Sequence, residues 1–309
     1  MTEPVVLYEE RDAVAFVTLN RPQKKNTLTE AVVAGIADGI DRATASREVR
    51  AVVLRGAGGT FCAGYDLTDP SVASAFVHEG GEGEPGGGDP SAGPGWRSPF
   101  DAPRPGPRPG AWDPVWDWQI MSHNVRRFMK IWECPKPVIG QLEAWVIGGA
   151  TDLALCCDQL FMADDAVIGY PPSRIFGTPT TMLWVYRLGL ERAKQYLLAG
   201  AEIDAPTALR IGLVSEVHPA AELAPRLEEH ARRFRHIPAN QLALNKLLIN
   251  QAYENMGLRT TQLLGTLFDG VTRHTEEAYR WVESFGEWGF RDVIRERDRP
   301  WGDYGERGR

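Results

Sequence analysis

A glycine pair followed by a carboxylate is the feature of this sequence that points most directly to chemistry. Residues 146–158 read as a short apolar strand, the pair Gly148-Gly149, and a helix whose first turn carries Asp152. Glycine lets the backbone turn tightly, and the first N–H groups of a helix have no partner within it. Such a turn suits an oxygen that becomes negative during a reaction, with an acid or base beside it. The alternative is that Asp152 only offsets the helix dipole.

Three further segments accompany this motif. A buried strand over 51–54 leads through a glycine-rich turn into Phe-Cys-Ala-Gly-Tyr-Asp at 61–66. Residues 16–22 read Phe-Val-Thr-Leu-Asn-Arg-Pro, with Asn-Thr-Leu at 26–28, and residues 134–140 read Cys-Pro-Lys-Pro-Val-Ile-Gly. In this order and spacing, the four segments resemble the crotonase, or enoyl-CoA hydratase/isomerase, superfamily.

The resemblance implies an α/β fold, a crotonase-like spiral of ββα units with a helical C-terminal region. It places the spiral core in residues 1–215 and the helical region, which would cover the acyl-CoA site and build the oligomer, in residues 216–309. A homotrimer or a dimer of trimers is therefore expected. The family acts on acyl thioesters of coenzyme A, so coenzyme A enters as part of the substrate and no separate cofactor is expected.

The shared step of the family places negative charge on the thioester oxygen, and two backbone N–H groups hold that oxygen. By resemblance, these donors come from Ala63 and Gly149 in this chain. One such donor is typically worth about 3–4 kcal/mol of the barrier. Substrate contact is expected at Gly64, Tyr65 and Asp66, although Asp66 also suits a capping role in the turn that follows.

The catalytic carboxylates are where this sequence departs from the family. Hydratases of the family carry two glutamates that hold one water, and the first of them matches Asp152. The second falls directly after the first proline of the Ile-Gly-Tyr-Pro-Pro segment, where this chain has Pro172, which offers no acid or base. Tyr170 is expected in the substrate pocket, and Arg174 suits either an anionic acyl group or a surface ion pair.

The coenzyme is expected beside Gln23, Lys24 and Lys25, by resemblance to the loop that precedes the family's Asn-Ala-Leu. Two lysines near phosphates make electrostatic sense, and an ordinary solvated basic pair is the alternative.

Composition narrows the function further. The chain has 309 residues and a net charge of −7, which argues against a nucleic-acid partner. Neither a long apolar run nor a secretory signal is found, so no membrane association and a cytoplasmic location are expected. Cys62, Cys134, Cys156 and Cys157 show neither metal-ligand spacing nor a disulfide framework, so no metal site is predicted.

Elements that must position these residues alternate between strand and helix. Strands are expected at 5–8, 13–19, 51–54, 138–142, 159–162 and 212–214. Helices are expected at 30–46 with Thr29 as its cap, and at 119–132, 179–188, 191–199 and 204–211. Past residue 222 the pattern is helical, with breaks at Pro238 and Gly257, and residues 295–309 are expected to be frayed or docked on a neighbour.

A segment dominated by Gly and Pro at about 78–111 interrupts this pattern and is predicted to be a loop insertion. Trp112, Trp116 and Trp118 follow it. Either they pin the end of the insertion to the body of the protein, or they line a substrate pocket or an oligomer contact.

The sequence thus predicts an acyl-CoA-processing enzyme of the enoyl-CoA hydratase/isomerase type, with Asp152 as its acid/base. Because of Pro172, the alternatives are an isomerase or a specialised hydrolase that uses one carboxylate, and a non-catalytic acyl-CoA-binding homologue.

Overall fold

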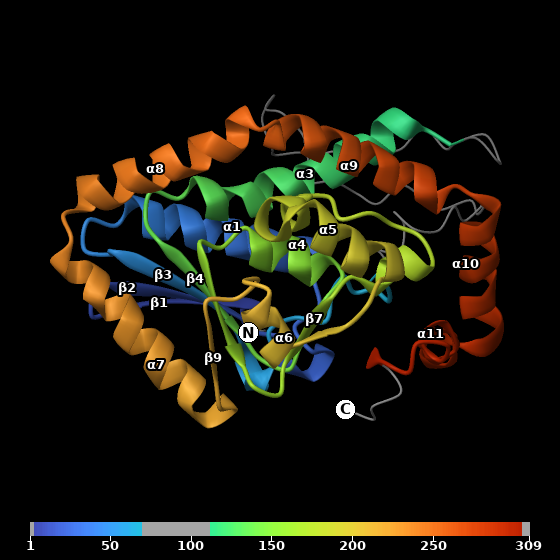
Figure 1. The fold of residues 1–309 in the computed structure, drawn as a ribbon, viewed down its shortest axis with the longest axis horizontal. Helices are drawn as coiled ribbons and strands as arrows, with labels where there is room; N and C mark the ends of the chain where they lie inside the picture. The colour runs from blue at the N-terminus through green and yellow to red at the C-terminus, as the bar shows by residue number, and fades with distance from the viewer. Residues whose placement is uncertain (1–2, 70–111, 305–309) are drawn as a thin grey trace.

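The computed structural model describes residues 3–69 and 112–304. The segment at about 78–111 lies outside the described residues. The chain forms a mixed α/β core around which helices of the C-terminal region are wrapped, so the expected fold is confirmed (Figure 1). The division of the chain at residues 215 and 216 remains a prediction.

A six-stranded sheet organises the core, with the order β1-β2-β3-β4-β6-β9. Its strands are β1 (Val6–Arg11), β2 (Val14–Leu19), β3 (Ala51–Gly56), β4 (Val138–Leu142), β6 (Gln159–Ala163) and β9 (Glu216–His218). The first two strands pair antiparallel, and every later pair is parallel. A smaller sheet has the order β5-β7-β8, from β5 (Trp145–Ile147), β7 (Val167–Gly169) and β8 (Ile203–Asp204).

Helices cover these sheets and fill the space between them. Those up to residue 210 are α1 (Glu30–Ala45), α3 (Pro114–Glu133), α4 (Gly149–Leu155), α5 (Leu183–Ala199) and α6 (Ala205–Arg210). Short 3₁₀ turns are η1 (Pro22–Lys24), η2 (Ala57–Gly59), η3 (Pro171–Arg174) and η4 (Phe234–His236). Thr29 caps α1 as predicted, because its hydroxyl accepts the Val32 N–H at 3.3 Å.

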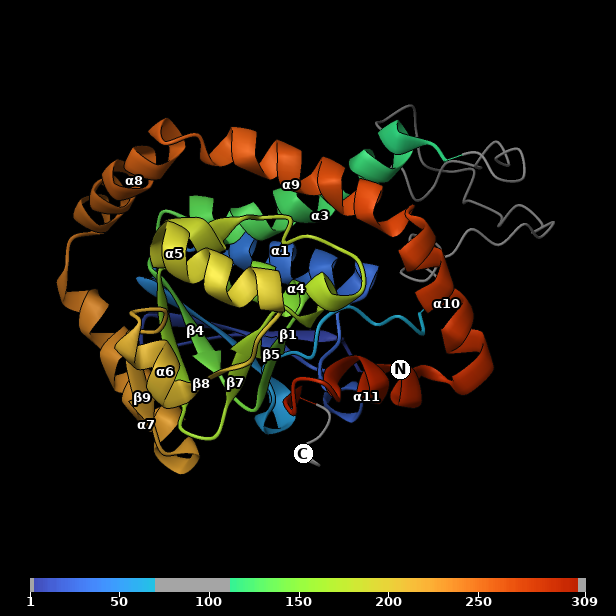
Figure 2. The same ribbon diagram turned by 45° about the vertical axis from the view of Figure 1, so that its right-hand side comes forward.

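The C-terminal helices form an arc around this core (Figure 2). They are α7 (Ala220–Arg233), α8 (Ala239–Asn255), α9 (Leu258–Arg273), α10 (Glu276–Trp288) and α11 (Phe290–Asp298). The predicted breaks are confirmed, since Pro238 precedes α8 and Gly257, with φ of 90°, precedes α9. Helix α9 packs along α3, which brings the C-terminal region against the core.

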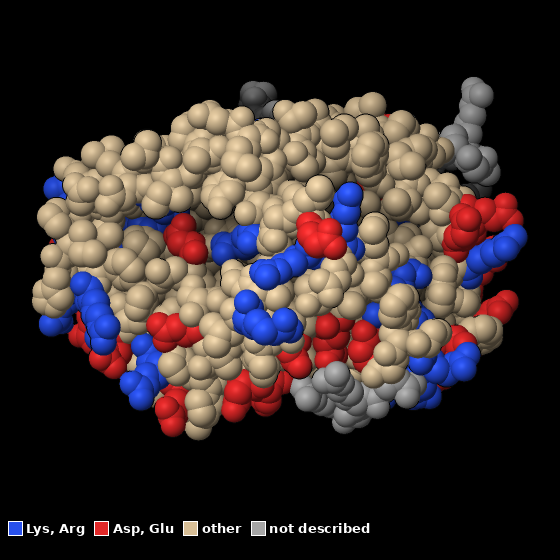
Figure 3. Space-filling model, viewed as in Figure 1, with Lys and Arg blue, Asp and Glu red and all other residues tan. Residues whose placement is uncertain are grey.

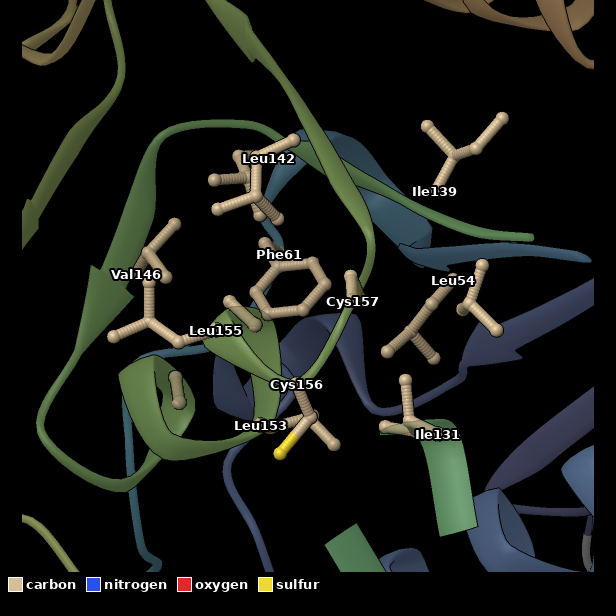
Figure 4. Close-up of a cluster of buried hydrophobic side chains, with 14 of the residues drawn as sticks. Leu54, Phe61, Ile131, Ile139, Leu142, Val146, Leu153, Leu155, Cys156 and Cys157 are labelled. Atoms are coloured by element: carbon tan, nitrogen blue, oxygen red, sulfur yellow. The ribbon is translucent and has the colours of Figure 1, made fainter. Parts of the chain in front are cut away.

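The hydrophobic core runs between the sheet and α4. Phe61, Val146, Leu153 and Leu155 are fully buried there, beside Cys156 and Cys157 (Figure 4). All four cysteines are buried thiols. This packing fixes the strand–turn–helix unit that carries Asp152, because β5 and α4 both bury side chains in this core.

Three departures from the predicted elements are the largest. Helix α3 begins at Pro114 rather than at 119, because the Asp113 carboxylate accepts the N–H groups of Val115 and Trp116. Helix α5 begins at Leu183 rather than at 179, whereas the predicted break between two helices is confirmed by the kink at Gly189, which has φ of 74° and ψ of 173°. Residues 212–214 are not a strand, since the Leu213 N–H bonds to the Ala208 carbonyl and the chain turns at Gly212 before β9 begins.

Residues 295–304 were also misjudged, because they dock on their own chain. Asp298 is fully buried and Tyr304 is nearly so, and the Tyr304 hydroxyl donates to the Gly200 carbonyl at 3.0 Å. Within residues 3–69 and 112–304, no helix has the length and apolar character needed to cross a bilayer.

Candidate active site

The turn between β5 and α4 is built around Gly148, which has φ of 57° and ψ of −124°. Its own N–H donates to the Gly169 carbonyl at 3.0 Å, and its carbonyl accepts the Thr151 hydroxyl at 2.7 Å. Gly149 is the first residue of α4, and its N–H makes no hydrogen bond within the described part of the chain. The turn therefore presents one open peptide donor at the helix start.

A second turn, over residues 62–66, lies against the first one. It is tied on one side by the Cys62 N–H, which donates to the Trp145 carbonyl at 2.9 Å. On the other side the Leu28 N–H donates to the Gly64 carbonyl at 2.8 Å. Gly64 has φ of 96°, and a Cβ there would lie 2.8 Å from the Ile147 carbonyl oxygen, so only glycine fits this approach.

The structure corrects the donor predicted at Ala63. The Ala63 N–H already donates to the Lys25 carbonyl at 3.0 Å, so it is not open to a substrate oxygen. Two residues later, the Tyr65 N–H makes no hydrogen bond among the residues described. The sequence did not reveal this difference because it depends on how the loop at Lys25 packs on the turn.

Asp152 lies beneath these turns and is buried. One of its oxygens, Oδ1, accepts both the N–H and the hydroxyl of Thr181, each at 2.7 Å. Burial raises the pKa of Asp152 to about 6, against the opposing effect of the bonds from Thr181. A carboxyl group with this pKa exchanges protons readily near neutral pH, which suits acid–base chemistry.

A cavity of about 470 Å³ joins these features. All but one of the predicted site residues line it: Lys24, Lys25, Ala63, Gly64, Tyr65, Asp66, Gly149, Asp152 and Tyr170. The exception is Gln23, which is exposed on the loop outside the cavity lining. The far wall comes from the C-terminal helices, through Phe285 and Phe290 among others, so segments far apart in sequence close one chamber.

Aromatic rings shape this chamber. A Cβ added to Gly149 would lie 2.4 Å from the Tyr65 ring, so that ring lies directly against the first turn of α4. Burial, followed by the charge of Asp152, raises the pKa of both Tyr65 and Tyr170 far above the ordinary phenol value. Both phenols therefore stay protonated and are hydrogen-bond donors rather than bases.

Asp66 lines the cavity but is held by its own chain. Its carboxylate accepts Arg21 Nη2 at 2.9 Å, the Thr68 hydroxyl at 2.6 Å and the Thr68 N–H at 3.2 Å. Burial raises the pKa of Asp66, and the bonds from Thr68 and Arg21 outweigh it and lower that pKa. These contacts match the capping role that the sequence allowed.

Arg174 neither lies on the surface nor faces a substrate. Its guanidinium binds Asp298 at 2.8 Å and Asp303 at 2.7 Å, and its side chain is 5% exposed. Both sequence interpretations of Arg174 are wrong, because the C-terminal segment folds over η3 and supplies the two partners.

Trp112, Trp116 and Trp118 are absent from the cavity lining. Trp112 stacks on His274 with ring centroids 4.7 Å apart, and its Nε1 donates to Asp117 at 3.2 Å. The contacts of Trp112 therefore agree with the interpretation that this side chain anchors the chain at residue 112 to the body of the protein.

One buried carboxylate in the cavity wall was not found by sequence reasoning. Asp269 comes from α9 and accepts the Thr178 N–H at 3.0 Å, and it pairs with Arg273 at 3.1 Å. It belongs to no motif, and only its spacing of four residues from Arg273 on a helix gave a hint. Among the residues described, no group of His, Cys, Asp or Glu is arranged to hold a metal ion.

Known proteins resemble this chain over most of its length. Residues 9–79 and 118–288 match the family described as enoyl-CoA hydratase/isomerase. The (E)-benzylidenesuccinyl-CoA hydratase of Thauera aromatica is 27% identical over 92% of this chain and 96% of its own length. The crotonyl-CoA hydratase of Syntrophomonas wolfei is 26% identical over 82% of this chain and 83% of its own.

Solved structures agree with these relatives. An enoyl-CoA hydratase from Mycobacterium smegmatis superposes with a TM-score of 0.83 and 34% identity, over 98% of this chain and 96% of that one. Family match, sequence relatives and fold thus coincide with the two glycine turns and the cavity between them. The chain belongs to the enoyl-CoA hydratase/isomerase family of enzymes.

Proposed function

We propose that this enzyme processes acyl-CoA thioesters by stabilising a thioester enolate, with Asp152 as the acid/base. One observation carries the proposal. Two open peptide donors, the N–H groups of Tyr65 and Gly149, belong to residues that line one cavity together with the buried carboxyl group of Asp152. Such donors act on charge that develops in the transition state, and they act most strongly where water is excluded.

Hydration of an enoyl-CoA is the reaction that we infer. The relatives named above are hydratases, which supports this choice. In the first step a hydroxyl oxygen from water bonds to C3, and the C2–C3 π electrons move to the thioester oxygen between the two N–H donors. Asp152 then gives a proton to C2 and the carbonyl re-forms, and the proton that the water has released restores the acid.

Coenzyme A is placed at the Lys24 and Lys25 side of the cavity in this proposal. Both lysines line it, and Lys25 Nζ lies 5.1 Å from the centre of the Trp145 ring. Phosphate groups in this position would meet positive charge on a protein that is otherwise acidic.

Isomerisation is the second candidate, favoured by Pro172. This residue lies beside Gly148, where a Cβ would be 3.4 Å from the Pro172 ring, and it supplies no carboxylate. A single carboxyl group at Asp152 can move a proton between two carbons without water.

A second copy of the chain is the proposed partner. Large apolar side chains are exposed along the outer faces of α8 and α9: Leu244, Leu247, Leu248, Ile249, Leu263, Leu264 and Phe268. Figure 3 shows few charged residues over these two helices. A contiguous apolar surface of this kind marks a protein–protein contact, and homo-oligomerisation would cover it.

The experiment that tests the function is turnover of 2-enoyl-CoA and 3-enoyl-CoA thioesters, followed by mass spectrometry in labelled water. Asp152→Asn preserves the shape and removes the proton-transfer group, so we expect turnover to fall by about 10²-fold or more with acyl-CoA affinity retained. Unchanged turnover in Asp152→Asn would mean that Asp152 only offsets the dipole of α4 and takes no part in proton transfer. Absence of turnover in the parent enzyme, with binding intact, would favour a non-catalytic binder.

A further inference from the structure

Asp269 lies beside the position that lacks a carboxylate. The point above Gly177, where a Cβ would be, is 3.2 Å from Asp269 Oδ1 and 3.6 Å from Pro172 Cβ. The Tyr170 hydroxyl is 3.7 Å from the same point. A carboxylate from α9 therefore reaches the part of the cavity that η3 borders.

The carboxylate is held firmly in this position. Oδ1 accepts the Thr178 N–H at 3.0 Å, and Arg273 Nε lies 3.1 Å from Oδ2. Arg273 also binds Asp117 at 2.5 Å, and all three charged side chains are buried. Burial raises the pKa of Asp269, and the Arg273 guanidinium opposes this rise by favouring the ionised form, which can accept a proton.

Asp152 and Asp269 line the same cavity. The charges of both raise the pKa of Tyr65 and of Tyr170, after the larger effect of burial, and the charge of Asp269 raises the pKa of Asp152. The cavity wall also carries Thr180, whose buried hydroxyl has no hydrogen-bond partner in the described part of the chain. A buried hydroxyl of this kind usually finds a water or a ligand.

We propose that Asp269 is the second catalytic carboxylate of this site, acting with Asp152 in the addition of water. The inference rests on the proposed function and deepens it, since it favours hydration over isomerisation. Two carboxyl groups that flank one water can divide the work of base and acid between them.

In the addition of water, two proton transfers are divided between the two carboxyl groups. Asp269 accepts a proton from water while the water oxygen bonds to C3 and the C2–C3 π electrons move to the thioester oxygen. The carboxyl group of Asp152 then gives its proton to C2 and the enolate electrons form the C2–H bond. Asp269 now carries the proton that Asp152 has lost, and the next water, bound between them, returns it.

A purely structural role is the rival. Asp269 could serve only to clamp α9 to the loop that carries Thr178 and Thr181, because Thr178 also donates to the Gly265 carbonyl at 2.8 Å. Asp117 provides the matched control, since it is a buried aspartate on the same Arg273 and lies outside the cavity lining.

The test compares Asp269→Asn, Asp152→Asn and Asp117→Asn in the full chain. Two rates are measured: water addition to 2-enoyl-CoA, and exchange of C2 protons of the saturated acyl-CoA in deuterated water. We expect Asp269→Asn to lower water addition by at least about 10²-fold while C2 exchange stays within a few fold. Asp152→Asn should lower both rates, and Asp117→Asn should leave their ratio unchanged.

Loss of both rates in proportion, or an equal effect of Asp117→Asn, would overturn the role of Asp269. A parent that exchanges C2 protons but hydrates no 2-enoyl-CoA would also overturn it, and would leave enolate stabilisation by this site standing with isomerisation as the reaction. A parent with neither rate would remove the proposed function itself. Should Asp269→Asn not fold, Asp269→Glu keeps the charge opposite Arg273 and moves the carboxylate by one methylene. Water addition should then fall alone, and equal loss of the two rates would contradict the inference.

Discussion

At the scale of single residues, Asp152 combines burial with two hydrogen bonds that its Oδ1 accepts from Thr181. Its environment raises its pKa to about 6, whereas an unfolded aspartate titrates near pH 3.9. Between pH 3.9 and about pH 6, Asp152 holds a proton in the native state that it has released in the unfolded state. The stabilisation of the native state by this proton is complete below about pH 4 and is lost as the pH rises through 6.

Asp152→Asn removes this titration, so its stability should depend less on pH. Relative to the parent, the variant should gain free energy of unfolding between pH 4 and pH 7, by up to about 3 kcal/mol. Denaturant unfolding of both proteins at several pH values measures the difference. A gap between the two proteins that stays constant with pH would show that Asp152 titrates normally.

A second prediction at this scale concerns Gly149. In Gly149→Ala the new methyl group would lie 2.4 Å from the partly buried Tyr65 ring, so the ring must move and the cavity must change shape. We expect a loss of about 1–3 kcal/mol of stability and a fall in turnover of about 10²-fold. Thermal unfolding and steady-state kinetics measure the two effects.

Gly286→Ala is the matched control for that substitution. Gly286 lies within α10, and a Cβ there meets nothing within 4 Å in the described structure. Alanine is the better helix former, so stability should rise by up to about 1 kcal/mol with turnover unchanged. Equal losses in both glycine variants would contradict the steric argument at Gly149.

At the scale of elements, Arg174 fastens the C-terminal segment over η3. Asp298 and Asp303 both bind it, and α11 carries Phe290 and Ile294 into the cavity wall. The guanidinium also stacks beneath the Trp301 ring, at 4.7 Å from its centre. One buried cation thus joins η3 to the segment that closes the chamber.

Arg174→Met should release this segment without unfolding the core. It leaves Asp303 without its cation and Asp298 with Arg297 alone, which should cost up to about 3 kcal/mol of local stability. Hydrogen exchange over residues 290–304 should accelerate and acyl-CoA affinity should fall. Arg295→Met is the control, because Arg295 pairs with Asp292 in solvent. Similar exchange in both variants would argue against a fastening role.

At the scale of the whole molecule, the outer faces of α8 and α9 leave a large uncharged surface. Leu248 is 73% exposed on α8 and Phe268 is 51% exposed on α9. Burying such side chains between copies of the chain is worth about 1.5–3 kcal/mol each. The proposed association between copies of the chain would gain free energy by covering these side chains.

Leu248→Glu combined with Phe268→Glu should shift the chain toward the monomer, as measured by light scattering after size-exclusion chromatography. A charge within an apolar contact has no partner there and must lose its water. Leu198→Glu changes an equally apolar residue that is 80% exposed on α5, and it should leave the mass unchanged. A monomeric parent would contradict the proposed assembly.

Local patterns determined those parts of the site that depend on a few consecutive residues. The strand, the positive-φ glycine and the helix start at 145–155 follow from apolar residues, a glycine pair and a helical pattern in sequence order. The Thr29 cap and the breaks at Pro238 and Gly257 have the same local origin. Such features are readable because the residues that cause them are adjacent.

Only the tertiary structure decided which groups are available for chemistry. The Ala63 N–H is occupied because the loop at Lys25 crosses its turn, and the Tyr65 N–H is left open by the same packing. Asp269 reaches the cavity because α9 packs along α3, more than one hundred residues after Asp152 in the chain. Hydrogen-bond partners and burial depend on contacts between distant segments, and no local spacing records them.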